Sequence, residues 1–126
     1  MAEISMNGVG GTAYVTMNKK PSDTLAVGMA VTLTGANEVG LGVAGGSPVF
    51  GIISHVEKEG DVVGVQTSGF NDAVTMTATT ANQPATGSLF ACNNKGELIK
   101  VETAPAGNRG FITAIDTASI KATVLL

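Results

Sequence analysis

The sequence is poor in the side chains that carry most protein chemistry. Its 126 residues include no tryptophan, one tyrosine, one histidine and one cysteine, and only 13% of them are charged. A single cysteine excludes an internal disulfide and a cysteine-rich zinc cluster. One histidine leaves little with which to activate a nucleophile or a water molecule. We therefore expect no enzyme activity, no metal site and no bound cofactor.

Basic residues and long apolar runs are also scarce. The formal net charge is −3, and the lysines and arginines form no cluster beyond Lys19 and Lys20. Nucleic-acid binding requires a clustered basic footprint, so we expect none. The longest strongly apolar stretch, near residues 49–53, is far shorter than the roughly 20 residues that span a bilayer. The N-terminus also lacks the pattern of a signal peptide, so we expect no membrane association, with synthesis and folding in a cytoplasm.

Glycine, threonine and small apolar residues are abundant in the sequence. The chain has 17 glycines and 15 threonines, and 44% of it is hydrophobic, enough for one modest core. Low charge is unusual for a free monomer, whose surface is normally rich in charged residues. It is typical of a protein with much of its surface covered by neighbours, because charges are depleted at interface cores.

The apolar residues recur with a period of two. Met29, Val31 and Leu33 alternate with alanine and threonine, and residues 74–79 and 120–124 repeat the pattern. Alternate side chains point to opposite faces of a strand, so each run predicts a strand with one face inward and threonine outward. Nine short strands are expected, at residues 12–17, 29–34, 49–56, 61–67, 74–79, 88–92, 97–102, 109–116 and 119–125.

This spacing predicts a single all-β domain over residues 1–126, either a compact β-sandwich or a partly open β-barrel. Residues 88–92 and 97–102 form one expected hairpin, and residues 109–116 and 119–125 form another. A short helical turn is expected near residues 22–26, since Ser22 or Asp23 could cap it. Residues 80–87 are expected to form a loop that joins two halves of one fold.

Residues 1–11 differ from the β core at 12–126. They end in the flexible stretch Gly-Val-Gly-Gly and contain only isolated apolar residues. One interpretation is a frayed terminus. The other is a flexible N-terminal arm that orders against a partner, for instance by adding a strand to its sheet. The candidate contact residues of this arm are Ala2, Glu3, Ile4, Ser5, Met6 and Asn7.

Two patterns resemble functional motifs but fit structural roles better. Residues 40–45 match the G-x-G-x-x-G spacing, and Asp61 follows about 20 residues later. Because Gly46, Pro48 and Gly51 come next, no helix is expected to open there, and we interpret the stretch as a glycine-rich loop. His55 has Ser54 and Glu57 nearby, but adjacent strand residues point to opposite faces, so we expect a surface histidine.

The remaining candidates are also interpreted structurally. Glu57, Glu59 and Asp61 are expected at a solvated hairpin tip rather than around a calcium ion. Cys92 lies in an expected strand and is predicted to be a small packed residue. Lys95 lies at an expected hairpin tip, the place where lipoyl and biotinyl carrier domains present a modified lysine, but without the flanking residues of those domains.

Several stretches resemble the head decoration or capsid cement proteins of tailed bacteriophages. They are residues 60–69, 86–90, 94–98 and 109–114, which together with residues 27–33 give the family's order of short β units from about residue 27 to the end. The resemblance implies a homotrimer on the outside of an icosahedral virion. There it would hold neighbouring copies of the major capsid protein together against the pressure of the packaged DNA, with an N-terminal arm against the shell.

The resemblance carries over no catalytic residue. It places the protein on the exterior of a virion after synthesis in the cytoplasm of a host bacterium. Two alternatives stay open. One is a β-sandwich ligand-binding or carbohydrate-binding module, although such modules usually expose aromatic platforms and this chain has only Tyr14 and four phenylalanines. The other is a carrier domain modified at a lysine.

Overall fold

The computed structural model describes residues 11–57 and 60–126 and confirms the expected all-β fold. The described residues contain ten strands and one short 3₁₀ helix, η1 (Thr80–Asn82). The strands are β1 (Ala13–Lys19), β2 (Ala30–Gly35), β3 (Glu38–Gly40), β4 (Gly51–Val56), β5 (Val62–Ser68), β6 (Phe70–Thr75), β7 (Phe90–Cys92), β8 (Leu98–Lys100), β9 (Phe111–Asp116) and β10 (Lys121–Leu125).

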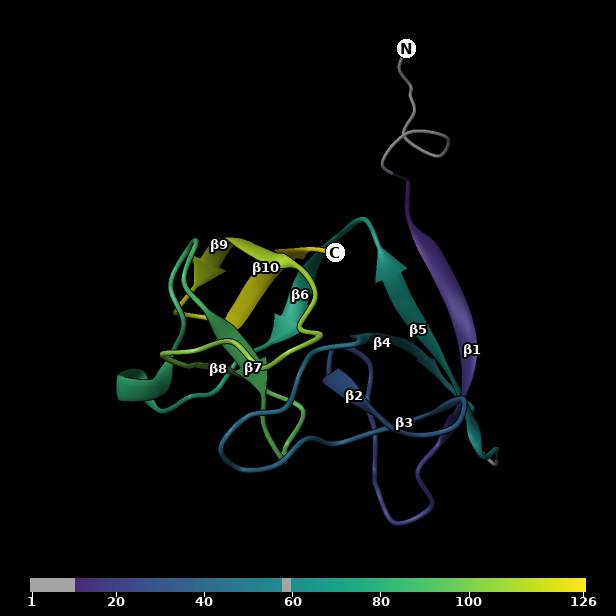
Figure 1. Ribbon diagram of the computed structural model, residues 1–126. Helices are drawn as coiled ribbons and strands as arrows, with labels where there is room; N and C mark the ends of the chain where they lie inside the picture. The colour runs from purple at the N-terminus through teal and green to yellow at the C-terminus, as the bar shows by residue number, and fades with distance from the viewer. Residues whose placement is uncertain (1–10, 58–59) are drawn as a thin grey trace.

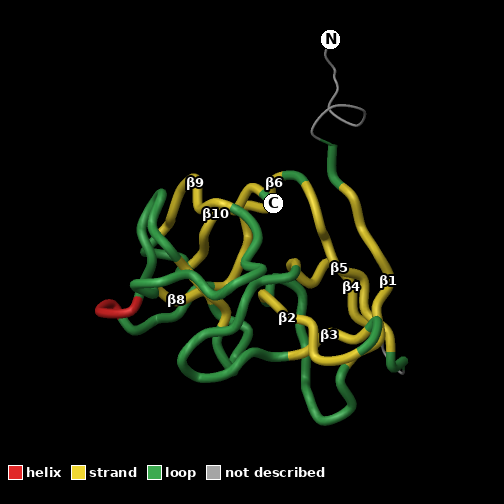
Figure 2. The backbone as a smooth tube through the Cα atoms, viewed as in Figure 1, coloured by secondary structure: helices red, strands yellow, loops and turns green. Residues whose placement is uncertain are grey.

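The first five strands close a small barrel, and the other five form two small sheets beside it. The barrel order is β1-β3-β2-β4-β5, with β5 pairing back onto β1. The pairing of β1 with β3 is parallel, and the other pairings in the barrel are antiparallel. A three-stranded sheet in the order β6-β10-β9 and the β7-β8 hairpin lie on the other side of the molecule (Figures 1 and 2). The barrel part is therefore closed rather than partly open.

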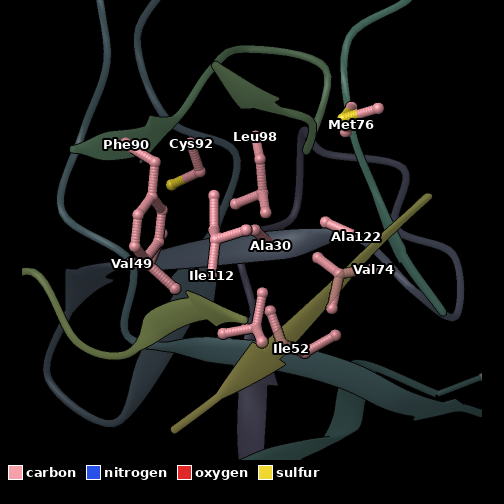
Figure 3. Packing of buried hydrophobic residues seen from close by; sticks show 11 residues of the cluster. Ala30, Val49, Ile52, Val74, Met76, Phe90, Cys92, Leu98, Ile112 and Ala122 are labelled. Carbon is pink, nitrogen blue, oxygen red and sulfur yellow. The ribbon is translucent and has the colours of Figure 1, made fainter. Parts of the chain in front are cut away.

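Two hydrophobic clusters share the strands β2 and β4. Val31 and Ile53 point into the barrel, whereas their neighbours Ala30 and Ile52 join a second cluster against the two small sheets (Figure 3). Adjacent strand residues face opposite sides, so one strand serves both clusters. The expected division of β2 into an inward apolar face and an outward threonine face is wrong at Thr32, which is buried.

Gln66 joins the barrel to the three-stranded sheet. Its side chain is only 3% exposed. The amide nitrogen donates to the backbone oxygens of Ser68, at 3.0 Å, and Phe70, at 2.9 Å. The amide oxygen accepts from Nδ2 of Asn71 at 3.0 Å. A buried amide is stable only when its donors and acceptor are paired, and these three bonds fix the turn between β5 and β6.

Three expectations about individual elements need correction. The strand β3 was not expected; it follows a tight turn at Asn37, whose φ of 54° is left-handed. The strand expected at residues 74–79 lies earlier, at β6. No helical turn forms at residues 22–26, and the Asp23 carboxylate accepts a hydrogen bond from the backbone N–H of Leu41, 2.8 Å away.

Both expected hairpins are present. The strands β7 and β8 pair with each other, and β9 pairs with β10. Asp116 shapes the second turn: its Oδ1 accepts hydrogen bonds from the backbone N–H groups of Ala118, at 3.0 Å, and Ser119, at 3.2 Å. Hydrogen bonds from the Ser119 side chain and from backbone N–H groups hold the pKa of the Asp116 carboxyl below its ordinary value of 3.8.

Candidate functional site

The expected N-terminal arm lies mostly outside the described residues. Ala2, Glu3, Ile4, Ser5, Met6 and Asn7 belong to this part of the chain, so their contact role stays a prediction. The structure begins at Gly11, whose backbone oxygen accepts a hydrogen bond from Oγ of Ser68 at 3.0 Å. This bond attaches the start of the described chain to the end of β5.

The glycine-rich stretch at residues 40–45 is a loop, as expected. It leaves β3 and enters a turn without any helix, so it offers no helix N-terminus to a pyrophosphate. A Cβ at Gly42 would lie 2.5 Å from the backbone oxygen of Cys92. Glycine is therefore required at this position by close packing against β7.

Cys92 is a packed thiol. Its side chain is buried in the cluster beneath the two small sheets (Figure 3). Burial is the largest influence and raises the pKa of the thiol to about 11, because removal from water disfavours the thiolate. A thiol with this pKa is a poor nucleophile at neutral pH, which fits the packing role expected from the sequence.

The acidic hairpin tip and Lys95 are both polar surface features. Glu59 lies outside the described residues, and the described part of the chain contains no group of three side chains able to hold a metal ion. Lys95 is exposed in the turn between β7 and β8, as expected. Oδ1 of Asn93 accepts hydrogen bonds from the backbone N–H groups of Lys95 and Glu97, both at 2.9 Å, and so builds that turn.

His55 lies on the surface, but its relation to Ser54 differs from the expectation. The pairing of β4 with β5 shifts register between Ile53 and His55, which marks a β-bulge at Ser54. A bulge turns two successive side chains away from strict alternation. Ser54 and His55 consequently line the same surface hollow, and Nε2 of His55 contacts the carboxylate of Glu57.

An apolar row crosses the outer face of the three-stranded sheet. Phe70 of β6 and Phe111 of β9 are both register partners of Leu125 in β10, so the three side chains share one face. Phe111 is 72% exposed and Phe70 is 58% exposed. This face lies opposite the buried side, where Val124 and Ile112 pack into the core. We call Phe70, Leu125 and Phe111 the outer sheet row.

A groove continues from the outer sheet row. It has a volume of about 540 Å³ and lies between residues 87–90, the loop at residues 104–110 and the start of β9. Leu89 and Phe111 contribute apolar walls, and both are exposed. Arg109 lies in the groove and donates from its guanidinium to the backbone oxygen of Thr67 at 2.7 Å. The row and the groove together form one apolar surface with a single basic side chain in it.

The sequence signal for the outer sheet row was ambiguous. The strand expected at residues 109–116 has apolar residues on both faces, so its period could not tell Phe111 from Ile112. The register shift between Thr123 and Val124 decides which side chains face outward, and a bulge of this kind leaves no mark in the pattern.

In comparisons with known proteins, no protein-family model and no curated protein matches the chain. Among the described residues, none of the helical structure is long and apolar enough to cross a membrane. The site is therefore interpreted from its own geometry, which includes the apolar surface formed by the outer sheet row and the groove.

Proposed function

We propose that this protein is a structural virion protein that binds the outer surface of an icosahedral phage capsid, as a homotrimer, and stabilises the mature shell. The observation that supports this most is the outer sheet row. Two exposed phenylalanines flank a half-buried leucine on three neighbouring strands. Contiguous exposed apolar surface of this kind marks protein–protein contact sites.

The chemistry of the uncovered surface also favours adhesion. Burial of apolar surface contributes about 25 cal/mol per Å², and phenylalanine is among the residues with the most area to bury. The edge strand β9 of the three-stranded sheet is paired at Ile112, whose oxygen accepts a hydrogen bond from the backbone N–H of Gly87 at 2.9 Å, and the rest of such an edge can pair with another chain. Assembly into a trimer and onto a shell would cover both features.

Attachment to a lattice supplies the stabilising mechanism. Each trimer would contact several capsid subunits, so weak single contacts would combine into strong attachment. A ligand stabilises the state that it binds by mass action. If the trimer binds only the expanded shell, each bound copy shifts the shell toward that expanded state. The protein needs no reactive group for this task.

Cryo-electron microscopy of the virions tests the proposal directly. We expect density for the protein on the shell exterior at three-fold or quasi-three-fold positions. Particles without the protein should lose their DNA at a lower temperature than complete particles. Absence of the protein from purified particles, or its location inside the shell, would overturn the proposal.

A substitution in the outer sheet row tests the surface itself. Phe111→Ser should lower the trimeric fraction in solution or the fraction bound to expanded shells by about tenfold or more, as measured by light scattering and co-sedimentation. Val27→Ser is the matched control, because Val27 is 63% exposed but lies outside the row and the groove. Equal assembly and binding by both variants would remove the row from the interface.

Removal of residues 1–11 tests the arm. We expect the shortened chain to stay folded and trimeric but to bind shells more weakly than the full chain. Loss of folding would contradict the assignment of this segment as an arm, and unchanged shell binding would contradict its contact role.

A further inference from the structure

A hollow of about 460 Å³ lies over β1, β4 and β5, on the outside of the barrel. Thr16, Gly64 and His55 form one cross-strand row there, because Gly64 is the register partner of both Thr16 and His55. Glycine in the middle of the row leaves a gap between two side chains that lie two strand spacings, about 10 Å, apart. The floor of the hollow is therefore backbone.

Gly64 is required by this shape and not by its backbone conformation. A Cβ at this position would lie 3.1 Å from Oγ of Ser54 and 3.2 Å from Cβ of His55. Its φ is outside the left-handed region, so an alanine could adopt the same backbone conformation. The bulge at Ser54 places the side chains of Ser54 and His55 beside the position where Gly64 lacks a side chain. Bulges often redirect side chains at functional sites.

Tyr14 supplies an aromatic wall. It precedes Thr16 by two residues on the same strand, lines the hollow and is 60% exposed. Within the described residues, the hydroxyl groups of Tyr14, Thr16 and Ser54 make no hydrogen bond to another protein group. They are therefore available to a ligand, together with the ring nitrogen of His55 that does not face Glu57.

We propose that this hollow binds a neutral sugar ring. An exposed aromatic side chain offers its face to the C–H groups of a pyranose, while hydroxyl and imidazole groups bond to the sugar hydroxyls. No lysine, arginine or carboxylate is among the described residues that line the hollow, so charge gives no preference for an ionic ligand. Ligand sites of this size combine an aromatic wall with a few convergent polar groups.

This inference stands apart from the proposed capsid function. The hollow lies on the barrel, whereas the outer sheet row belongs to the three-stranded sheet. On a repeated assembly, many weak sugar sites would act together and raise the affinity for a glycan-covered surface. Loss of sugar binding and loss of shell binding are measured separately, so either can fail alone.

The test uses the full chain and an array of neutral and charged glycans, followed by saturation-transfer NMR with methyl glycosides of the bound sugars. We expect binding of at least one neutral hexose or N-acetylhexosamine. Tyr14→Ala should weaken it by about tenfold or more, whereas Tyr14→Phe should retain it, because the ring provides the stacking. Gly64→Ala, which fills the floor, should also weaken it by about tenfold.

Gly45→Ala is the matched control, because a Cβ there meets nothing within 4 Å and the residue lies outside the hollow. It should bind like the unaltered chain. Thermal unfolding of each variant shows that it is folded, and Tyr14→Ala preserves the test if Gly64→Ala does not fold. The proposal is overturned if no neutral glycan is retained above the Tyr14→Ala background. Binding that is equal in the unaltered chain, Tyr14→Ala and Gly64→Ala, or binding of charged glycans alone, overturns it too.

Discussion

Replacement of Gln66 by leucine should destabilise the protein by about 3 kcal/mol. The change keeps the volume of the buried side chain close to constant but removes three hydrogen bonds, two to backbone oxygens and one from Asn71. Each such bond contributes about 1 kcal/mol net, and the abandoned partners lie partly out of water at the β5–β6 turn. For a chain of this length, a loss of about 3 kcal/mol lowers the melting temperature by about 10 °C.

Urea unfolding followed by circular dichroism measures this loss. Gln83→Leu is the control, because Gln83 donates a single hydrogen bond, to the backbone oxygen of Thr77 at 3.0 Å, and should cost about 1 kcal/mol. All proteins are compared at one concentration, since assembly would make stability depend on it. A Gln66→Leu protein no less stable than the Gln83→Leu protein would refute the assignment of Gln66 as the link between barrel and sheet.

Three further predictions concern single residues. Cys92 should resist thiol reagents at pH 8 in the folded protein and react on unfolding. Burial raises the pKa of the Cys92 thiol to about 11. The stability linked to this shift is therefore complete below pH 9 and is lost as the pH rises toward 11. Urea titrations at several pH values will show this loss. Gly96→Ala should cost more stability than Gly107→Ala: both residues have positive φ, but a Cβ at Gly96 would lie 2.7 Å from Met29, whereas one at Gly107 meets nothing. The lowered pKa of the Asp116 carboxyl stabilises the fold when the pH is above the ordinary pKa of the group, and this stabilisation is lost as the pH falls through the folded-state pKa. Asp116→Asn should therefore remove the part of the acid destabilisation that comes from Asp116. Thermal melts between pH 2 and 5 will show this.

The alternating pattern predicted strands well where one face is buried and one is exposed. In β10, Ala122 and Val124 point into the core as their spacing predicts. The pattern was less informative for β2 and β4, because both faces of these strands are buried. Ile52 and Ile53, for example, are buried in different clusters, so hydrophobic residues occur on both faces and no alternation with polar residues is seen. The three residues of β3 are too few to show a period at all.

The surface sites were harder to predict than the fold. Both the hollow at Gly64 and the orientation of Phe111 depend on bulges, and a bulge changes the facing of side chains without changing their order in the sequence. Tyr14 was named from the sequence as a candidate aromatic residue for carbohydrate binding, but the sequence did not show which residues surround it. Its exposure follows from the pairing of β1 with β5, a contact between segments about 50 residues apart that local patterns do not encode.

The division into two clusters has a consequence for the order in which the chain folds. The barrel cluster draws only on residues between Met17 and Val65, so it contains no side chain from the part of the chain that follows residue 70. The other cluster requires Ala30, Val49 and Ile52 from the first half and cannot be completed without them. We therefore expect the barrel to fold first and the later strands to pack against it. A destabilising substitution in the barrel should disturb folding more than an equally destabilising substitution after residue 70.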